Sequence, residues 1–223
     1  MQRRQLMILG GTLLAASPLT WAAVTETDAA SGIRLALERG AESAIAGLGK
    51  TDGFMGNPAV KIELPGYLKD GAKLLKMTGQ GKQVDDLLLA MNRAAEAAVP
   101  AARPLLLNAV KSMSVEDALQ IVKGSDDSVT QFFAAKTREP LTAQFLPIVT
   151  QATQKVALAD KYNAVAGKGV GFGLVKSEDA NIQQYVTKRA LDGLFLMIAE
   201  EERKIRKDPL ASGSALLKKV FGG

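Results

Sequence analysis

Residues 181–209 constrain the fold of this 223-residue chain most, because apolar side chains recur there at helical spacing. The apolar positions are separated by three, four and seven residues and are Ile182, Tyr185, Val186, Leu191, Leu194, Phe195, Ile198 and Ile205. Between residues 190 and 199 only Asp192 and Gly193 interrupt the apolar run, and a helix that is apolar on every side is normally buried among other helices. We therefore predict a central helix that ends at Pro209, with Leu194, Phe195 and Ile198 almost fully buried.

Helical periodicity also appears in most of the remaining chain. It predicts helices over 31–48, 66–78 and 82–99, then a helix that opens with a capping box at Ser114 and ends at Gly124. Ser125 is expected to cap the next helix. Pro140 and Pro147 are expected to interrupt the helical segment that follows. A glycine-rich linker is expected at 167–173 and a short amphipathic tail after residue 212. The fold class is thus all-α, a single-domain bundle of about eight helices spanning residues 23–223.

The exception to this helical pattern is residues 50–65, which carry two glycines and two prolines and are expected to form an irregular loop. Val60, Ile62 and Leu64 alternate with charged residues, which indicates a short extended piece that is either an edge strand or not regular at all. Phe54 and Met55 are unusually apolar for a loop, so we expect them to be held in the core.

The first 22 residues have the organisation of a secretory signal peptide. Arg3 and Arg4 precede a short apolar run, and small residues around Ala22 supply a cleavage site. The apolar run is too short to span a membrane, and the chain has no cysteine for a lipid anchor. We expect a periplasmic protein that begins near Ala23, is not transmembrane after cleavage, and is exported by the general secretion or the twin-arginine route.

Composition excludes several classes of chemistry. The chain has no histidine and no cysteine, so it can hold no Ser-His-Asp triad, no Cys-His pair and no zinc site of imidazole or thiolate ligands. Carboxylates, hydroxyls, lysines and tyrosines remain, so the chain is poorly provisioned for an enzyme but does not exclude one, and we assign no catalytic residue, no metal and no cofactor. Loss of the two arginines of the signal segment lowers the net charge from +5 to +3, a mild excess that does not indicate nucleic-acid binding.

Five residues are candidates for contacting a ligand or partner: Asp52, Phe54, Asn57, Arg93 and Asp192. Asp52 and Asn57 share a glycine-containing loop that could hold a cation, but the spacing of a calcium loop is absent. Asp192 lies in the apolar run and needs a donor from another segment, for which we prefer Arg93. A structural ion pair is favoured over a functional acid there.

Two further features of the central helix have structural explanations. Gly193 is expected to mark a close contact with another helix, because glycine inside a helix costs about 1 kcal/mol relative to alanine. The charged end at 200–207 is expected to be exposed and self-paired through Glu200 with Lys204 and Glu202 with Arg206.

Several long blocks together resemble one known family. They are DGFMGNPAVKIELP (52–65), MNRAAEAAVPAARPLL (91–106), KSMSVEDALQIVKG (111–124), FLPIVTQAT (145–153) and ALDGLFLMIAEEERKIRKDP (190–209). With these blocks the chain resembles the exported bacterial family catalogued as domain of unknown function 4197. The resemblance implies a helical exported protein and brings no activity, substrate or catalytic residue with it.

Three hypotheses for the function follow, in order of preference. The first is a non-enzymatic exported protein that binds a partner protein or an envelope component, and an exposed apolar patch would favour it. The second is a carrier of an apolar ligand such as a lipid, which needs a large cavity between helices. The third is an enzyme that uses carboxylates and lysines, which needs two carboxylates converging in a cleft.

Overall fold

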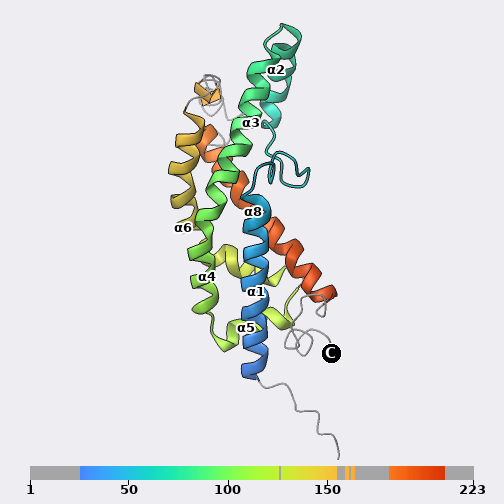
Figure 1. Cartoon of the computed structure of the whole chain (residues 1–223), viewed down its shortest axis with the longest axis vertical. Helices are drawn as coiled ribbons and strands as arrows, with labels where there is room; N and C mark the ends of the chain where they lie inside the picture. The colour runs from blue at the N-terminus through green and yellow to red at the C-terminus, as the bar shows by residue number, and fades with distance from the viewer. Residues whose placement is uncertain (1–25, 126, 155–158, 161, 164–180, 209–223) are drawn as a thin grey trace, which may run out of the picture.

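The structure is a computed structural model that describes residues 26–125, 127–154, 159–160, 162–163 and 181–208. These residues form α-helices and loops, with no strand among them. The helices are α1 (Glu26–Leu48), α2 (Gly66–Met77), α3 (Gly81–Ala98), the 3-10 helix η1 (Val99–Ala102), α4 (Arg103–Lys111), α5 (Val115–Lys123), α6 (Ser128–Thr153) and α8 (Ile182–Lys207) (Figure 1). The predicted all-α single domain is confirmed. The residues predicted to form a signal peptide, a glycine-rich linker and an amphipathic tail lie outside the described residues.

The part of the chain that is described holds fewer α-helices than the eight or so that we predicted. One reason is that Pro140 and Pro147 lie inside the continuous helix α6 instead of dividing it. Both prolines are exposed, on the side of α6 away from the core. A proline removes one backbone hydrogen bond from a helix, and a carbonyl left without that bond on an exposed side can be solvated.

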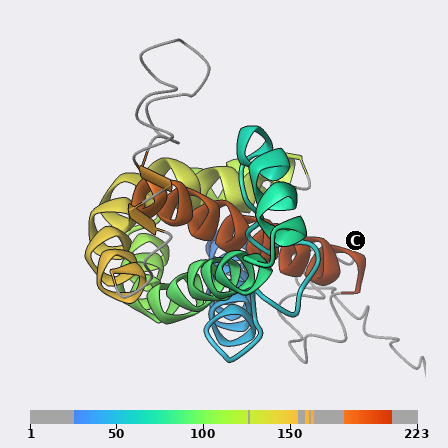
Figure 2. The same ribbon diagram turned by 90° about the horizontal axis from the view of Figure 1, so that it is seen from above.

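Helix α8 is the central helix, as predicted, and it packs against α1, α3 and α6. Figures 1 and 2 show it crossing the bundle obliquely. Leu194, Phe195 and Ile198 are 0, 3 and 1% exposed, which confirms their predicted burial. The expectation that this helix is buried on every side is wrong, because Leu196 is 36% exposed. One side of α8 therefore faces a cleft instead of another helix.

Of the two helix caps predicted from the sequence, the one at Ser114 is present and the one at Ser125 is not. Ser114 Oγ accepts the N–H of Asp117 at 3.0 Å and Asp117 Oδ2 accepts the N–H of Ser114 at 3.1 Å, a complete capping box for α5. Asn181 Oδ1 accepts the N–H groups of Gln183 and Gln184 at the start of α8. Ser125 does not cap α6, which begins after Asp127.

Helices α2 and α3 form a hairpin whose turn projects beyond the rest of the bundle (Figure 1). The turn is a Schellman motif, with Gln80 N–H donating to Leu75 O at 2.8 Å and Gly79 N–H to Lys76 O at 3.4 Å. Gly79 has a φ of +81°, a backbone conformation that glycine adopts without strain. The predicted end of this helix at Gly79 is confirmed to within one residue.

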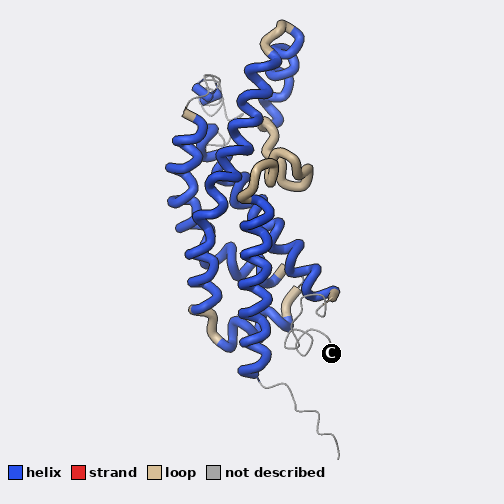
Figure 3. Tube along the Cα trace, viewed as in Figure 1, coloured by secondary structure: helices blue, strands red, loops and turns tan. Residues whose placement is uncertain are grey.

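The segment between α1 and α2 is irregular throughout, as Figure 3 shows in tan. The edge-strand alternative for residues 60–64 is therefore wrong, although the inward alternation of Val60, Ile62 and Leu64 is observed, since all three are buried. We call residues 49–65 the core loop, because Phe54, Val60, Ile62 and Leu64 are part of the hydrophobic core.

Candidate functional site

The core loop begins with a tight turn at the end of α1. Gly49 N–H donates to Ile45 O at 2.8 Å and closes the helix. Asp52 adopts a φ of +63°, a left-handed conformation that Asp tolerates better than most residues. A Cβ on Gly53 would clash with the Leu48 carbonyl oxygen, so only glycine fits there. The chain can therefore fold back over the bundle directly after α1.

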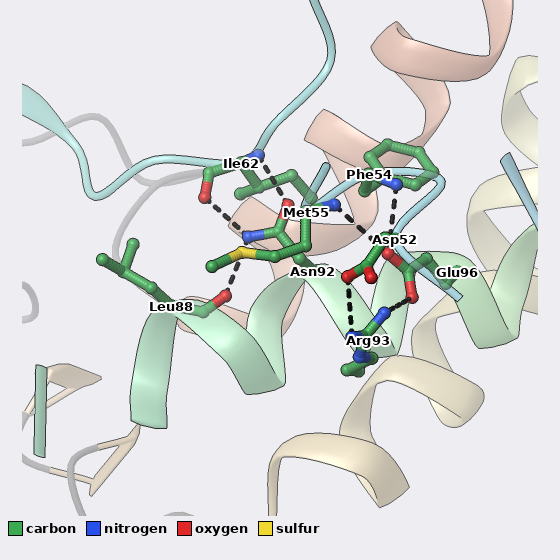
Figure 4. Close-up of polar contacts among 8 residues, drawn as sticks. All are labelled: Asp52, Phe54, Met55, Ile62, Leu88, Asn92, Arg93 and Glu96. Atoms are coloured by element: carbon green, nitrogen blue, oxygen red, sulfur yellow. Dashed lines mark hydrogen bonds and ion pairs between the residues drawn. The ribbon is translucent and has the colours of Figure 1, made fainter. Parts of the chain in front are cut away.

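Three charged residues then hold the loop to α3, and we call Asp52, Arg93 and Glu96 the clasp (Figure 4). Glu96 Oε1 accepts the N–H of Phe54 at 3.0 Å and that of Met55 at 3.2 Å. Arg93 donates from Nη1 to Glu96 Oε2 at 2.6 Å and from Nη2 to Asp52 Oδ1 at 2.8 Å. The pKa of Arg93 is raised above its ordinary value, mainly by the hydrogen bond to Glu96 and to a lesser extent by the one to Asp52. The clasp joins loop backbone and helix side chains into one charge-assisted network.

Asn92, on the same helix, supplies the second anchor and is fully buried (Figure 4). Its Oδ1 accepts the N–H of Ile62 at 2.8 Å, and its Nδ2 donates to Ile62 O at 3.0 Å and to Leu88 O at 2.8 Å. The side-chain amide thus bonds both backbone groups of Ile62, as a neighbouring strand would. This contact explains how an irregular, buried residue satisfies its backbone hydrogen bonds without a sheet.

The third anchor is steric and joins the loop to α8. Phe54 is completely buried, as predicted, and a Cβ on Gly193 would lie 2.7 Å from Phe54 Cε1 and 3.3 Å from Val60 Cβ. The close contact expected at Gly193 is therefore made with the core loop and not with another helix. Met55 was also predicted to be held in the core, but it is only partly buried.

Asn57 is positioned by the fold of the loop itself. Its Oδ1 accepts the N–H of Ala59 at 3.1 Å, and its backbone carbonyl accepts the N–H groups of Val60 and Lys61. Its Nδ2 lies 3.8 Å from Met197 Sδ on α8. Asn57 therefore stabilises a turn against α8. As for the cation considered at Asp52 and Asn57, no group of three or more acidic side chains that could hold a metal ion occurs among the described residues.

The preferred partner for Asp192 was wrong, since Arg93 is engaged in the clasp. Asp192 Oδ1 instead accepts a hydrogen bond from Arg138 Nη1 of α6 at 2.9 Å. The guanidinium of Arg138 also lies over the ring of Phe195, 4.9 Å from its centroid. The expected donor from another segment is thus present, but the Asp192 side chain is 38% exposed rather than buried. The side of α8 that carries Asp192 is the one left uncovered.

An open cleft of about 520 Å³ lies between that uncovered side of α8 and the core loop, and we call it the loop cleft. Residues 59–65 of the loop and the start of α2 form one wall, and the other carries Tyr185, Arg189, Asp192 and Leu196. Tyr185 Oη donates to the backbone carbonyl of Glu63 at 2.7 Å and ties the two walls together.

Charged groups of both signs surround the loop cleft. Arg189 lies over the ring of Tyr185, 5.2 Å from its centroid, and Lys69 Nζ lies 3.8 Å from Glu63 Oε2. Of the five candidate residues, only Asp192 lines the cleft; Phe54, Asn57 and the two members of the clasp hold its loop wall in place. The anchors Asn92 and Glu96 were missed, although a polar pair four residues apart beside Met91 and Ala95 was a visible signal.

The charged end of α8 was expected to be exposed, but part of it is buried. The predicted Glu202–Arg206 pair is present at 2.8 Å, but the Glu202 side chain is only 3% exposed. Its Oε1 also accepts the N–H of Val129 in the first turn of α6 at 3.3 Å, and Arg206 donates to Ile121 O of α5 at 2.9 Å. Burial is the main cause that raises the pKa of Glu202 above its ordinary value. Lys204 pairs with Glu201, and a pairing with Glu200 is not formed.

Comparison with known proteins identifies a family and nothing more specific. A family model described as a protein of unknown function (DUF4197) matches residues 23–222. The chain belongs to the DUF4197 family. The resemblance drawn from the sequence blocks is thereby confirmed. No curated protein and no solved structure matches this DUF4197 chain. No helix within its described residues is long and apolar enough to cross a membrane.

Proposed function

We propose that this DUF4197 protein is exported to the periplasm and acts there as a non-enzymatic binding protein, recognising a partner protein or another envelope component in the loop cleft. Support for export comes from the order of Arg3 and Arg4, the apolar run and the small residues around Ala22. The family match also starts at residue 23, directly after the expected cleavage site.

The observation that carries the proposal is the preformed loop cleft. Its loop wall is fixed from three directions, by Glu96, by Asn92 and by Phe54 against Gly193. A wall that is already ordered loses little conformational entropy on binding, which favours affinity. An irregular loop with this many anchors is therefore better explained as a built recognition surface than as a connection between two helices.

The lining of the loop cleft indicates the chemistry of its partner. Lys61, Arg189 and Asp192 offer charges of both signs, while Leu196 offers an exposed apolar side chain at 36%. This mixture suits a segment with both polar and apolar groups, such as a stretch of polypeptide. It does not resemble the mainly apolar lining of a lipid pocket.

The two other hypotheses receive less support. The apolar cavity between α1, α6 and α8 has a volume of about 10 Å³, enough for at most one water, whereas a lipid carrier needs far more room. The hollow between α6 and α8 has a volume of about 430 Å³, but it is open and the cations Arg138 and Lys188 line it, whereas the pocket of a lipid carrier buries most of its ligand. Glu63 and Asp192 both line the loop cleft, but each is paired with a base, Lys69 and Arg138, instead of sharing a substrate position. We therefore rank the carrier second and the enzyme third.

Native mass spectrometry of the protein purified from the cell envelope tests this proposal. The wild-type chain should carry a co-purifying component, and Leu196→Lys should lose it. Leu89→Lys is the matched control, since Leu89 is an equally large, exposed apolar residue at 42% on α3 and does not line the loop cleft. Equal retention by both variants would contradict a role for the cleft, and N-terminal sequencing that found intact Met1 outside the envelope would contradict export.

A further inference from the structure

The projecting turn of the α2–α3 hairpin carries the most exposed large apolar side chains among the described residues. Met77 is 85% exposed and Leu74 is 61% exposed. They lie three residues apart and so share one side of α2. We call residues 73–82 the hairpin tip.

Packing within the hairpin does not require these two residues. Helix α2 already contacts the core through Leu68, Ala72 and Leu75, which are partly buried. The Schellman turn at Gly79 and Gln80 fixes the end of the helix independently of Met77. Leu74 and Met77 thus add an apolar surface that the fold of the hairpin leaves uncovered.

Within residues 71–84 every charged residue is a lysine, and the exposed acids Asp85 and Asp86 of α3 follow directly after this stretch. The three lysines, Lys73, Lys76 and Lys82, are all exposed. Lys76 pairs with Asp85 at 2.7 Å, but this pair lies at the surface, with both side chains at least half exposed. The hairpin tip therefore combines two exposed apolar side chains with three exposed lysines.

We propose that the hairpin tip docks on the anionic surface of a lipid bilayer, with Met77 and Leu74 entering the headgroup region and the three lysines facing lipid phosphates. A basic amphipathic helix with apolar side chains at its exposed end has the composition of a membrane-surface element. This contact is peripheral, and it is independent of the loop cleft, because none of the hairpin-tip residues lines the cleft.

The shape of the tip favours a membrane over a protein partner. Figure 1 shows the tip as the far end of a narrow projection, which can reach a flat surface before the rest of the bundle does. A stable protein interface usually buries about 800 Å² on each partner, which a single helical turn cannot supply. Insertion of two flexible apolar side chains into a bilayer needs no such complementary area.

Vesicle flotation at low ionic strength tests the proposal. The wild type should float with vesicles of phosphatidylglycerol and phosphatidylcholine but not with phosphatidylcholine alone. Combined replacement of Lys73, Lys76 and Lys82 by Gln should lower binding by about fivefold per lysine, as expected for basic residues at an anionic surface. The matched control replaces Lys111, Lys123 and Lys136, which are also exposed, by Gln and should bind as the wild type does. Any contribution of the N-terminal segment is common to both variants and cancels.

A fluorescent label locates the contact, because the chain has no cysteine and a single introduced cysteine is labelled uniquely. A polarity-sensitive dye on Met77→Cys should brighten and shift to the blue with the anionic vesicles, whereas the same dye on Gln144→Cys, an exposed residue of α6, should not respond. Equal flotation of the two triple variants, a silent dye at 77, or a dye that responds to lipid-free envelope protein and not to vesicles would overturn the proposal.

Discussion

The core loop and the hairpin tip lie in adjacent parts of the chain and reverse the usual relation between regularity and packing. The core loop has no regular secondary structure, yet Phe54 and Ile62 are 0 and 2% exposed. The hairpin tip is helical, yet Met77 is 85% exposed. Figure 3 shows the two regions one above the other along the molecule.

The difference shows that the hydrogen bonding of the backbone and the burial of side chains are separate requirements. Backbone hydrogen bonds are satisfied within the helix at the tip, so its side chains remain available for the surface. In the core loop, Glu96 and Asn92 satisfy the backbone from outside, so an irregular segment can be buried. Secondary structure therefore does not predict which of the two regions contributes more to stability.

The largest expected effect comes from emptying the aromatic site of the loop. Phe54→Ala should lower the free energy of unfolding by about 3–5 kcal/mol, because it removes a fully buried ring. Met77→Ala at the hairpin tip should change it by less than about 0.5 kcal/mol. Urea unfolding followed by circular dichroism measures both, and a similar midpoint for the two variants would remove the contrast between the regions.

A smaller loss is expected when the clasp loses its acceptor. Glu96→Ala should lower the free energy of unfolding by about 2–3 kcal/mol. The change leaves the buried N–H of Phe54 and the partly buried N–H of Met55 without their acceptor. Glu96→Gln keeps an acceptor oxygen and should cost less. In the hairpin, Asp85→Ala breaks an exposed pair and should cost no more than about 1 kcal/mol. Hydrogen exchange should also show faster exchange of the Phe54 amide in Glu96→Ala but not in Asp85→Ala.

The steric contact between loop and α8 predicts a sign change. Gly193→Ala should destabilise by about 1–2 kcal/mol, because its Cβ would lie 2.7 Å from Phe54. In a Phe54→Ala background the same change should be neutral or stabilising, since alanine favours the helix. Gly40→Ala is the control, as a Cβ there has its nearest contact at 3.7 Å and should stabilise α1. Additive effects of Gly193→Ala and Phe54→Ala would contradict the contact.

The smallest effect is expected at the edge of the loop cleft. A double-mutant cycle on Asp192→Ala and Arg138→Ala should give a coupling below about 1 kcal/mol, because both side chains are well exposed to solvent. The pair tested is the observed Asp192–Arg138 pair, in place of the Asp192–Arg93 pair predicted from the sequence. A coupling of several kcal/mol would show that the cleft is closed to water.

The sequence predicted those features that depend on local patterns. The central helix, the capping box at Ser114 and the burial of Phe54 follow from spacing and residue type within a few positions. The partner of Asp192 could not be predicted, because the choice between Arg93 and Arg138 depends on how α3 and α6 are rotated about their axes. Asn92 and Glu96 were missed since they lie in an alanine-rich helix where polar residues are normally solvated.

The order of the helices along the chain has a consequence for when this protein can fold. Helix α8, against which α1, α3 and α6 pack, is the last of the described helices to be synthesised. Ribosomes add about 5–20 residues per second, so the apolar face of α1 waits on the order of ten seconds for its partner. A chain threaded across the membrane during synthesis would emerge before its core can close. A chain exported in folded form must first complete α8, so a truncation before residue 182 should block only the second kind of export.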